Sequence, residues 1–309
     1  MAKGKLAVNL EYAALRLAAA ALALIPYRIA LAFAGALAVA ASRVLRFKRA
    51  RTLARIRSVF PALSAREAAR IAERSLASAF RIGVELMRMR TFDRRWMDAH
   101  IVEGERYTGI LREHLGEGKG AVVMLPHTGN WYLAANAMAA YGIRMVGLGS
   151  RQRNPKIDAW MKANYGDMVF LDRDDRHSLV RIKESIREGR AFAIMPDLRV
   201  RAPDVEVDFL GGKANVSHAG AFFAVKCGSP IVLAATRREG ARHVIDYLGT
   251  LRPQPDAEPK AEAARLTREA MRRLDAYVRE HPGDWYWYNK RWILEPVMAA
   301  GSQPDTDAK

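Results

Sequence analysis

The chain has 309 residues, half of them apolar, which is enough for one large α/β domain with an additional element and a sizeable core. Its net charge at pH 7 is +17, and its single cysteine, Cys227, excludes a disulfide framework and a multi-cysteine zinc site. The seven histidines are scattered, without the spacing of a metal site. We therefore expect neither a metal ion nor a cofactor.

The positive charge is concentrated near the N-terminus, where residues 1–100 contain 19 lysines and arginines but six acidic residues. Residues 12–25 and 29–42 are alanine- and leucine-rich helical runs separated by Pro26, and a run of arginines and lysines follows them. Each run is shorter than the ~20 residues needed to span the hydrocarbon core of a membrane. An apolar hairpin followed by arginines is typical of an anchor on an anionic membrane surface.

We interpret residues 1–45 as an apolar helical segment that associates with a membrane in a peripheral or monotopic manner. A single tilted span and a helical cap on a soluble protein are the alternatives. A cleaved signal peptide fits poorly, because the apolar stretch continues past any early cleavage site. Nucleic-acid binding is not expected, since no nucleic-acid motif accompanies the charge.

The next segments predict an α/β domain over residues 46–297. Ser64 to Glu67 form a capping-box pattern that opens a helix running to about Arg90. Short apolar runs then alternate with helical patterns, which predicts a mostly parallel sheet with helices on both faces. The expected strands are 120–125, 143–146, 168–171, 191–195 and 231–235. The expected helices are 131–140, 155–165, 178–188, 217–226 and 258–280.

Two further segments, residues 205–209 and 243–247, could add edge strands to this sheet. Residues 298–309 are rich in Gly, Ser, Pro and Asp, and their composition predicts a disordered tail.

His127 is the first candidate for catalysis. It follows the apolar run that ends at Leu125 and precedes a Gly-Asn break and a helical pattern from Trp131. This order places an imidazole at the C-terminal end of a strand, where ligands of open α/β sheets bind, and beside the free N–H groups of a helix. Imidazole exchanges protons near neutral pH. Asn130 is the predicted N-cap of the helix and a candidate substrate contact.

Residues 126–132, Pro-His-Thr-Gly-Asn-Trp-Tyr, resemble the His-x4-Asp/Glu motif of the membrane glycolipid acyltransferases that include the lipid A lauroyl/myristoyl acyltransferases. The resemblance implies that His127 is a general base. It would remove a proton from an acceptor hydroxyl, which then attacks a thioester carbonyl. In the family, the motif carboxylate holds the imidazole tautomer and stabilises the imidazolium.

Tyr132 stands where the family has that carboxylate. A phenol can accept a hydrogen bond, but with a reference pKa of ~10 it is neutral near pH 7 and cannot neutralise an imidazolium. Either another carboxylate therefore serves His127, or the activity has lapsed. The best substitute is Asp197, because it follows the apolar run 191–195 and faces the same predicted sheet edge. A loop-capping role is the alternative for Asp197.

Residues 151–158 loosely resemble the family's Arg-x-x-Asn-Pro-x-x-Asp stretch. Either Arg151 or Arg153 could stand at the arginine position, and Asn154 at the asparagine position. A guanidinium there could bind a substrate phosphate bidentately. A solvated surface and a helix start at Asn154 are the alternative interpretation.

Residues 209–220 resemble the family's Phe-Phe-Gly-x-x-Ala…Thr/Ser…Gly loop, in which backbone amides at Gly211 and Gly212 could hold an oxyanion. A plain turn followed by an N-cap at Ser217 is the alternative. Residues 282–292 resemble the family's closing Pro-x-x-Trp-x-Trp-x-His-x-Arg-Phe/Trp signature, with Arg291 at the arginine position and asparagine at the usual histidine. We expect its tryptophans to pack in the core.

These motifs occur in the family's order between residues 45 and 295. The resemblance implies an acyltransferase on the cytoplasmic face of a bacterial inner membrane. It would transfer a fatty acyl chain from acyl-carrier protein or acyl-CoA to a hydroxyl of a glycolipid or lysophospholipid, as in lipid A biosynthesis. The basic surface would attract an acidic carrier protein. The alternatives are a catalytically lapsed member that binds lipid or membrane, and another membrane-surface role such as lipid transport.

Overall fold

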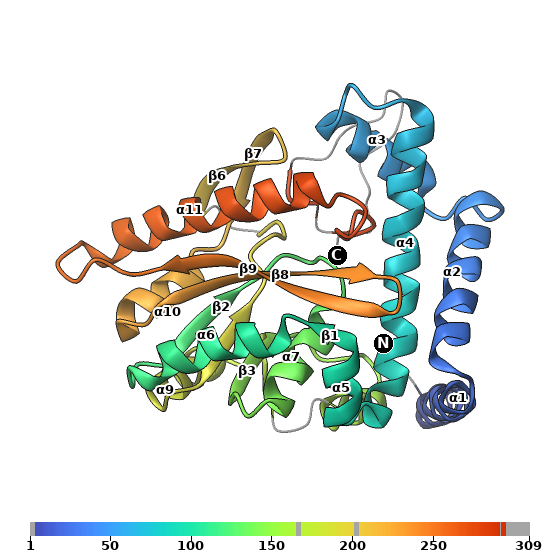
Figure 1. Ribbon diagram of the computed structural model, residues 1–309, viewed down its shortest axis with the longest axis horizontal. Helices are drawn as coiled ribbons and strands as arrows, with labels where there is room; N and C mark the ends of the chain where they lie inside the picture. The colour runs from blue at the N-terminus through green and yellow to red at the C-terminus, as the bar shows by residue number, and fades with distance from the viewer. Residues whose placement is uncertain (1–3, 165–167, 201–203, 291, 295–309) are drawn as a thin grey trace.

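The computed structural model describes residues 4–164, 168–200, 204–290 and 292–294 (Figure 1). The predicted tail at 298–309 and Arg291 lie outside these residues. The chain begins with four helices, α1 (Lys5–Leu24), α2 (Tyr27–Arg43), α3 (Arg49–Val59) and α4 (Ala65–Arg88). A short 3-10 helix, η1 (Met89–Thr91), follows α4.

The capping box predicted for α4 is confirmed. The Ser64 hydroxyl accepts a hydrogen bond from the backbone N–H of Glu67, and the Glu67 carboxylate accepts one from the backbone N–H of Ser64. These reciprocal bonds satisfy two N–H groups that would otherwise have no partner at the helix start. Helix α4 is long and straight. Helix α2 packs along one side of it, and the α/β domain lies along the other side (Figure 1).

The central sheet has seven strands in the order β1-β9-β8-β2-β5-β3-β4. Every neighbouring pair is parallel except β8 and β9, which confirms the mostly parallel sheet. The strands are β1 (Ile101–Val102), β2 (Ala121–Met124), β3 (Met145–Gly149), β4 (Val169–Asp172), β5 (Ala191–Ile194), β8 (Ile231–Glu239) and β9 (Arg242–Leu251).

Both predicted edge strands are wrong in their placement. β6 (Val205–Phe209) pairs with β7 (Gly212–Val216) in a separate antiparallel hairpin, and β9 lies between β8 and β1 rather than at the edge. The alternating burial of β6 suits a hairpin with one face packed and one face in solvent. The edge strand beside β9 is β1, which has only two residues and is too short to produce a sequence pattern.

Helices cover both faces of the sheet. Those on one face are α5 (Arg94–His100), α6 (Gly104–Gly116) and α7 (Trp131–Ala140). Those on the other are α9 (Ser178–Arg187), α10 (Ala219–Cys227) and α11 (Pro259–Glu280), while α8 (Pro155–Lys162) follows β3. Successive residues of β2 point to opposite faces, so Val122 and Val123 belong to different core clusters. The continuous apolar run that marks β2 in the sequence thus reflects burial on both faces.

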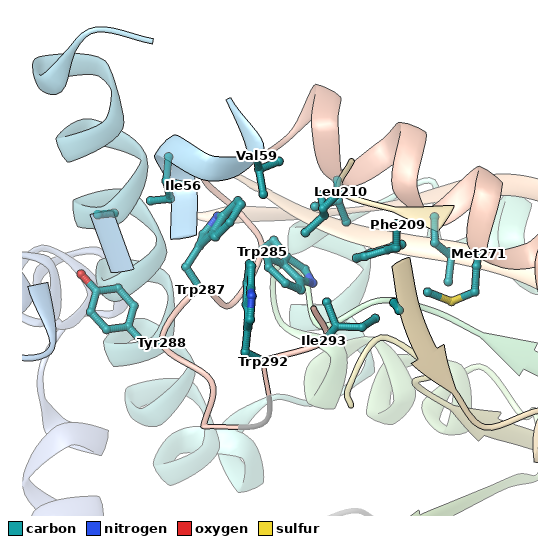
Figure 2. Close-up of a cluster of buried hydrophobic side chains, with 14 of the residues drawn as sticks. Ile56, Val59, Phe209, Leu210, Met271, Trp285, Trp287, Tyr288, Trp292 and Ile293 are labelled. Carbon is teal, nitrogen blue, oxygen red and sulfur yellow. The ribbon is translucent and has the colours of Figure 1, made fainter. Parts of the chain in front are cut away.

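A third cluster contains the C-terminal tryptophans (Figure 2). Trp285, Trp287 and Trp292 pack with ring centroids 4.9–5.7 Å apart, and all three are buried. Figure 2 shows them beside Ile56 and Phe209. The segment that follows α11 is therefore fixed against α3 and the β6–β7 hairpin, although it has no regular secondary structure of its own.

The N-terminal helices expose much of their apolar surface. Helix α1 has 20 residues, so it is longer than the run at 12–25, and by length and composition it can cross a membrane. The exposed large apolar side chains of this region are Leu6, Leu10, Leu17, Leu24, Ile29, Phe33, Leu37, Val44, Leu45 and Phe47. A surface of this kind in contact with water is unfavourable, and it marks a lipid or protein interface.

A buried ion-pair network joins α4 to the sheet. The fully buried Glu85 of α4 binds Arg238 of β8 (2.6 Å), His243 of β9 (3.1 Å) and the hydroxyl of Tyr27 (2.6 Å). Burial raises the pKa of Glu85, but the cationic partners and their hydrogen bonds outweigh it, so the pKa falls below its usual range. Burial lowers the pKa of His243, which leaves Arg238 as the counter-ion near pH 7.

We expect Glu85→Gln to lower the free energy of unfolding by about 3–5 kcal/mol, because it leaves the buried guanidinium of Arg238 without a counter-ion. The measurement is the midpoint of urea unfolding, compared between variant and wild type at an unchanged m-value. Glu105→Gln is the control, since Glu105 forms only an exposed pair with Arg94 and its loss is worth little. A midpoint for Glu85→Gln equal to that of the control would contradict the structural role of this pair.

The same pKa shift predicts a pH dependence. Because the pKa of Glu85 is lower in the folded state than in the unfolded chain, its ionised form stabilises the fold above the unfolded value of about 4.3. This contribution is lost as the pH falls below that value. The Glu85→Gln variant should therefore show a shallower loss of stability below pH 4 than the wild type.

Candidate active site

The loop after β2 carries His127 at the C-terminal edge of the sheet. Gly129 has a φ of +52°, and a Cβ atom there would lie 2.6 Å from the carbonyl oxygen of Thr236. The loop passes so close to β8 that only glycine fits. Asn130 then caps α7 by accepting a hydrogen bond from the backbone N–H of Leu133 (3.0 Å), which confirms the predicted N-cap.

Asp197 follows β5 and lies directly against His127. Its Oδ1 accepts a hydrogen bond from Nδ1 of His127 (2.6 Å), and its Oδ2 accepts one from the backbone N–H of the same residue (2.7 Å). The indole N–H of Trp285 also donates to Oδ2 (2.7 Å). The parallel pairing of β2 and β5 brings the two strand ends together. The structure thus places a carboxylate other than the motif position beside His127.

These contacts lower the pKa of Asp197 and decide which ring nitrogen of His127 faces it with a proton. Burial by itself raises the pKa of Asp197, but the attraction of His127 and the three donated hydrogen bonds outweigh it and lower the pKa. An ionised carboxylate can only accept hydrogen bonds, so Nδ1 of His127 carries a proton. In the neutral imidazole, Nε2 then has a lone pair available to accept a proton from another molecule. The His127 side chain is 13 % exposed.

Tyr132 lies on the first turn of α7, beside Trp131. Burial raises the pKa of its phenol, which is therefore neutral near pH 7. Nδ1 of His127 is bonded to Asp197, so Tyr132 does not hold the imidazole tautomer. The structure instead places Tyr132 in the wall of a cavity.

This apolar cavity extends from the His127 loop into the layer between the sheet and helices α6 and α7. Leu125 and Met195, which precede His127 and Asp197, contribute to its wall, as do Trp131 and Tyr132. The ring of Trp131 meets that of His127 edge to face, with centroids 5.0 Å apart. The other lining residues are almost all apolar, among them Leu111, Ala134, Ala135, Met138, Met145, Leu148, Met168, Phe170, Ala193 and Ile194. Such a space suits a hydrocarbon chain.

Two asparagines predicted to contact the substrate, Asn130 and Asn154, bind other groups of the protein. Asn130 is fully buried, and its amide group donates to Glu85 (2.7 Å), so both ends of its side chain bind within the protein. Asn154 caps α8 and donates to the carbonyl of Val8 in α1 (2.9 Å). Both side chains hold helices in place.

The two arginines of the same prediction lie on the surface. Arg151 forms an ion pair with Asp172, and Arg153 is exposed. Both follow the C-terminal end of β3, the sheet edge that also carries His127. A substrate contact for either arginine stays a prediction.

The glycine loop forms the turn of the β6–β7 hairpin. Gly211 has a φ of +80° in the turn between β6 and β7, next to Arg279 of α11, and Gly212 begins β7. The turn packs on α11, where the N–H of Leu210 donates to Asp275 (2.6 Å), and an oxyanion role for Gly211 and Gly212 stays a prediction. Ser217 precedes the N-cap of α10, which is His218, and its hydroxyl binds Asp204 (3.2 Å). The Ser217 hydroxyl also accepts the N–H of Ala219 (3.2 Å), so Ser217 caps the start of α10 as expected, one residue before the N-cap position.

Trp285 makes a contact at the candidate site that the sequence did not indicate. We expected it to pack in the core, and it does, but its indole N–H also binds Asp197. The backbone around it pairs with the His127 loop: Tyr286 donates its N–H to the carbonyl of His127, and Gly129 donates to the carbonyl of Asp284, both at 3.0 Å. The tryptophan signature was visible in the sequence, but its partner across the fold was not.

The fold and this site define the class of the protein, and comparison with known proteins agrees. Residues 6–293 match the family model of the bacterial lipid A biosynthesis acyltransferases, and the chain belongs to this family. It is an acyltransferase of the kind that acts on glycolipids.

The curated relatives include the phosphatidylinositol mannoside acyltransferases of Mycobacterium tuberculosis (strain H37Rv) and Mycolicibacterium smegmatis. Each is 24 % identical over 230 residues, which cover 72 % of this chain and 70 % or 72 % of the relative. The family and the apolar helix α1 together indicate association with a membrane.

We expect Asp197→Asn to lower the turnover number by about four orders of magnitude, as neutralising the triad aspartate does in serine proteases. In the variant, the amide oxygen of Asn would accept the two hydrogen bonds that Oδ2 of Asp197 accepts now, from the backbone N–H of His127 and from Trp285. The amide N–H would then face Nδ1 of His127, so the imidazole would have to carry its proton on Nε2. The imidazole then cannot act as a base. Thioester consumption measures the loss, and nitrogen NMR of the imidazole reports the tautomer.

Asp208→Asn is the matched control, because Asp208 is an exposed residue of β6 whose ion pair with Lys213 lies on the surface. Near-normal turnover of Asp197→Asn, with that of the control unchanged, would show that the carboxylate does not support catalysis.

Proposed function

We propose that the protein transfers a fatty acyl chain from an acyl thioester to a hydroxyl of a membrane glycolipid or lysophospholipid, with His127 as general base. The hydrogen bond between Nδ1 of His127 and the buried Asp197 carries this proposal. It gives the imidazole the orientation and charge partner that Tyr132 cannot supply. The alternative of a lapsed enzyme rests on the missing motif carboxylate, and the position of Asp197 supports the active enzyme instead.

In the proposed reaction, Nε2 of His127 takes the proton of the acceptor hydroxyl as its oxygen attacks the thioester carbonyl. The new C–O bond forms, the C–S bond breaks, and the proton on the imidazole passes to the leaving thiolate. Asp197 stabilises the imidazolium while it exists, as the aspartate of a hydrolase triad does. No acyl-enzyme intermediate is required, because donor and acceptor react directly.

The apolar cavity is the proposed site of the acyl chain. Its wall includes Leu125 and Met195, each two residues before His127 and Asp197, so a chain bound there would have its carbonyl carbon near the imidazole. Acyl-carrier protein and acyl-CoA both supply a thioester of this kind. The net charge of +17 favours the approach of either acidic donor.

The exposed apolar surface of α1 and α2 is the proposed membrane contact, made by residues 1–45. We infer a peripheral or monotopic attachment on the cytoplasmic face of a bacterial inner membrane, where thioester donors are found and anionic lipids attract the basic N-terminal region. Lipid A precursors and phosphatidylinositol mannosides are candidate acceptors, the latter from the names of the two relatives.

We expect His127→Gln to lower the rate of acyl transfer by roughly 10²–10⁴-fold, the usual contribution of a general base. The purified full-length protein is assayed with an acyl thioester and a lipid extract, and the product is measured by mass spectrometry. His177→Gln is the control, because His177 is an exposed histidine at the start of α9. Full activity of His127→Gln would refute the assignment of the base.

A second variant separates the active enzyme from a lapsed one. If the family motif must be complete for catalysis, Tyr132→Asp should raise turnover from a low level. We expect the opposite, because Tyr132 lines the apolar cavity and a carboxylate there would disfavour the acyl chain. An increase in turnover would therefore support the lapsed alternative.

We expect Ala135→Phe to shift the enzyme toward shorter acyl thioesters, since the larger ring would occupy part of the cavity lined by Ala135. Each methylene excluded from the cavity should weaken binding roughly fourfold. Competition between thioesters of different chain length measures this preference. Ala140→Phe, at the exposed end of the same helix, is the control and should leave the preference unchanged.

A further inference from the structure

A second groove, rich in arginine, separates helices α2 and α4 from the β8–β9 hairpin. Figure 1 shows the turn of this hairpin reaching toward α4. Five arginines, a serine and two acidic residues line the groove. They come from four parts of the chain: α2, α4, the β8–β9 hairpin and the segment after α11. They are Arg28, Arg74, Arg81, Arg238 and Arg242, with Ser78, Glu239 and Asp284.

The groove carries an excess of positive charge. Its two acidic residues are already paired, Asp284 with Arg74 (2.8 Å) and Glu239 with Arg237. Arg238 is paired with the buried Glu85 (2.6 Å). By contrast, Arg28, Arg81 and Arg242 form no ion pair with any residue that the structure describes. Three cations therefore face the groove without a counter-ion.

Arg81 is held where a cation is unfavourable. It is half-buried between α4 and α2, where its Nε donates to the carbonyl of Leu31 (3.3 Å). Burial lowers the pKa of Arg81, and the nearby charge of Arg238 lowers it further. A position of this kind gains stability when an anion binds.

Buried polar atoms in the groove also need a partner. The hydroxyl of Ser78 and Nε of Arg238 are buried, with no hydrogen-bond partner among the described residues. Both residues are more than nine-tenths buried. An oxyanion in the groove could accept a hydrogen bond from each and so remove the cost of leaving these donors unsatisfied.

The groove lies between the proposed membrane contact and the candidate active site. Arg28 lies on α2 next to the exposed Ile29, and Phe33 follows one turn further along the same exposed helix. On the opposite side, the carbonyl of Asp284 accepts a hydrogen bond from the N–H of Gly129 (3.0 Å). Gly129 follows His127 by two residues, so their Cα atoms are at most about 7 Å apart. A ligand in the groove would thus lie between the lipid surface and the backbone of the His127 loop.

We propose that this groove binds the phosphate of the lipid acceptor's headgroup, in an inference that rests on the proposed function. Arg28, Arg81 and Arg242 supply planar guanidinium groups, which bind phosphate oxygens bidentately. The bound phosphate orients the headgroup so that a hydroxyl faces Nε2 of His127. The acyl chain of the donor occupies the apolar cavity.

The test uses the full-length protein in a neutral detergent, titrated by calorimetry with glycerophosphoinositol. This probe is a phosphodiester without acyl chains, so it cannot bind through the apolar cavity. Inositol and inorganic phosphate are titrated in parallel. The variants are Arg81→Gln and the double variant Arg28→Gln/Arg242→Gln, whose exposed side chains can be changed without disturbing the core.

The control is Arg66→Gln/Arg70→Gln, which removes two exposed charges from α4 outside the groove. We expect wild type and control to bind the phosphodiester alike, and both groove variants to bind it at least about tenfold more weakly. Inositol should not bind. Equal affinity of groove variants and control, or no saturable binding to the wild type, would overturn the proposal. Tighter binding of inorganic phosphate than of the phosphodiester would show a site for the free ion instead.

Two further measurements separate this inference from the proposed function. His127→Gln should bind the phosphodiester as the wild type does while losing turnover, so binding reports on the groove alone. The groove variants should raise the KM for the lipid acceptor more than they change kcat, because the phosphate contact holds the headgroup and does not touch the reacting atoms. An unchanged KM in a variant that has lost binding would place the phosphate site outside the acceptor's path.

Discussion

The carboxylate of Asp197 is the constraint on which the candidate site depends. It is fully buried and accepts three N–H groups, two from His127 and one from Trp285. A buried anion without such donors would be strongly destabilised, so the three segments must meet in one arrangement. The ends of β2 and β5 and the segment after α11 are thereby fixed relative to one another. The orientation of the imidazole is a consequence of this requirement.

The C-terminal tryptophans explain how the segment without regular structure can be so well positioned. Trp285 is packed among Trp287, Trp292 and Phe209, and its backbone neighbours pair with the His127 loop. Buried aromatic rings contribute large apolar areas and prefer specific relative orientations. One cluster therefore supports both the hydrophobic core and the hydrogen bond to Asp197. This explains why the tryptophan-rich segment after α11 packs beside His127 and Asp197, although it lies far from them in the sequence.

Two spaces of opposite chemistry have walls that include residues near the His127 loop. One is the apolar cavity between the sheet and α7, and the other is the arginine groove beside α2 and α4. A transfer between a hydrocarbon-bearing thioester and a phosphate-bearing lipid would need this division, with the reacting atoms meeting at the imidazole. Glu85 helps to maintain it, because this single buried carboxylate binds both Asn130 of the loop and Arg238 of the groove.

The sequence by itself determined many of the local elements and the mostly parallel character of the sheet, but not its edge or the separate β6–β7 hairpin. The capping box of α4, the helix at 131–140 and the buried run of β2 depend on neighbouring residues, whose spacing is visible in the chain. It also indicated His127 and, from its place after a strand, Asp197. Only the tertiary structure decided that Asp197 binds His127, that Trp285 binds Asp197, and that Gly211 turns away onto α11. Contacts between segments 70 to 90 residues apart depend on packing and on the pairing of buried donors with acceptors, which no local pattern encodes.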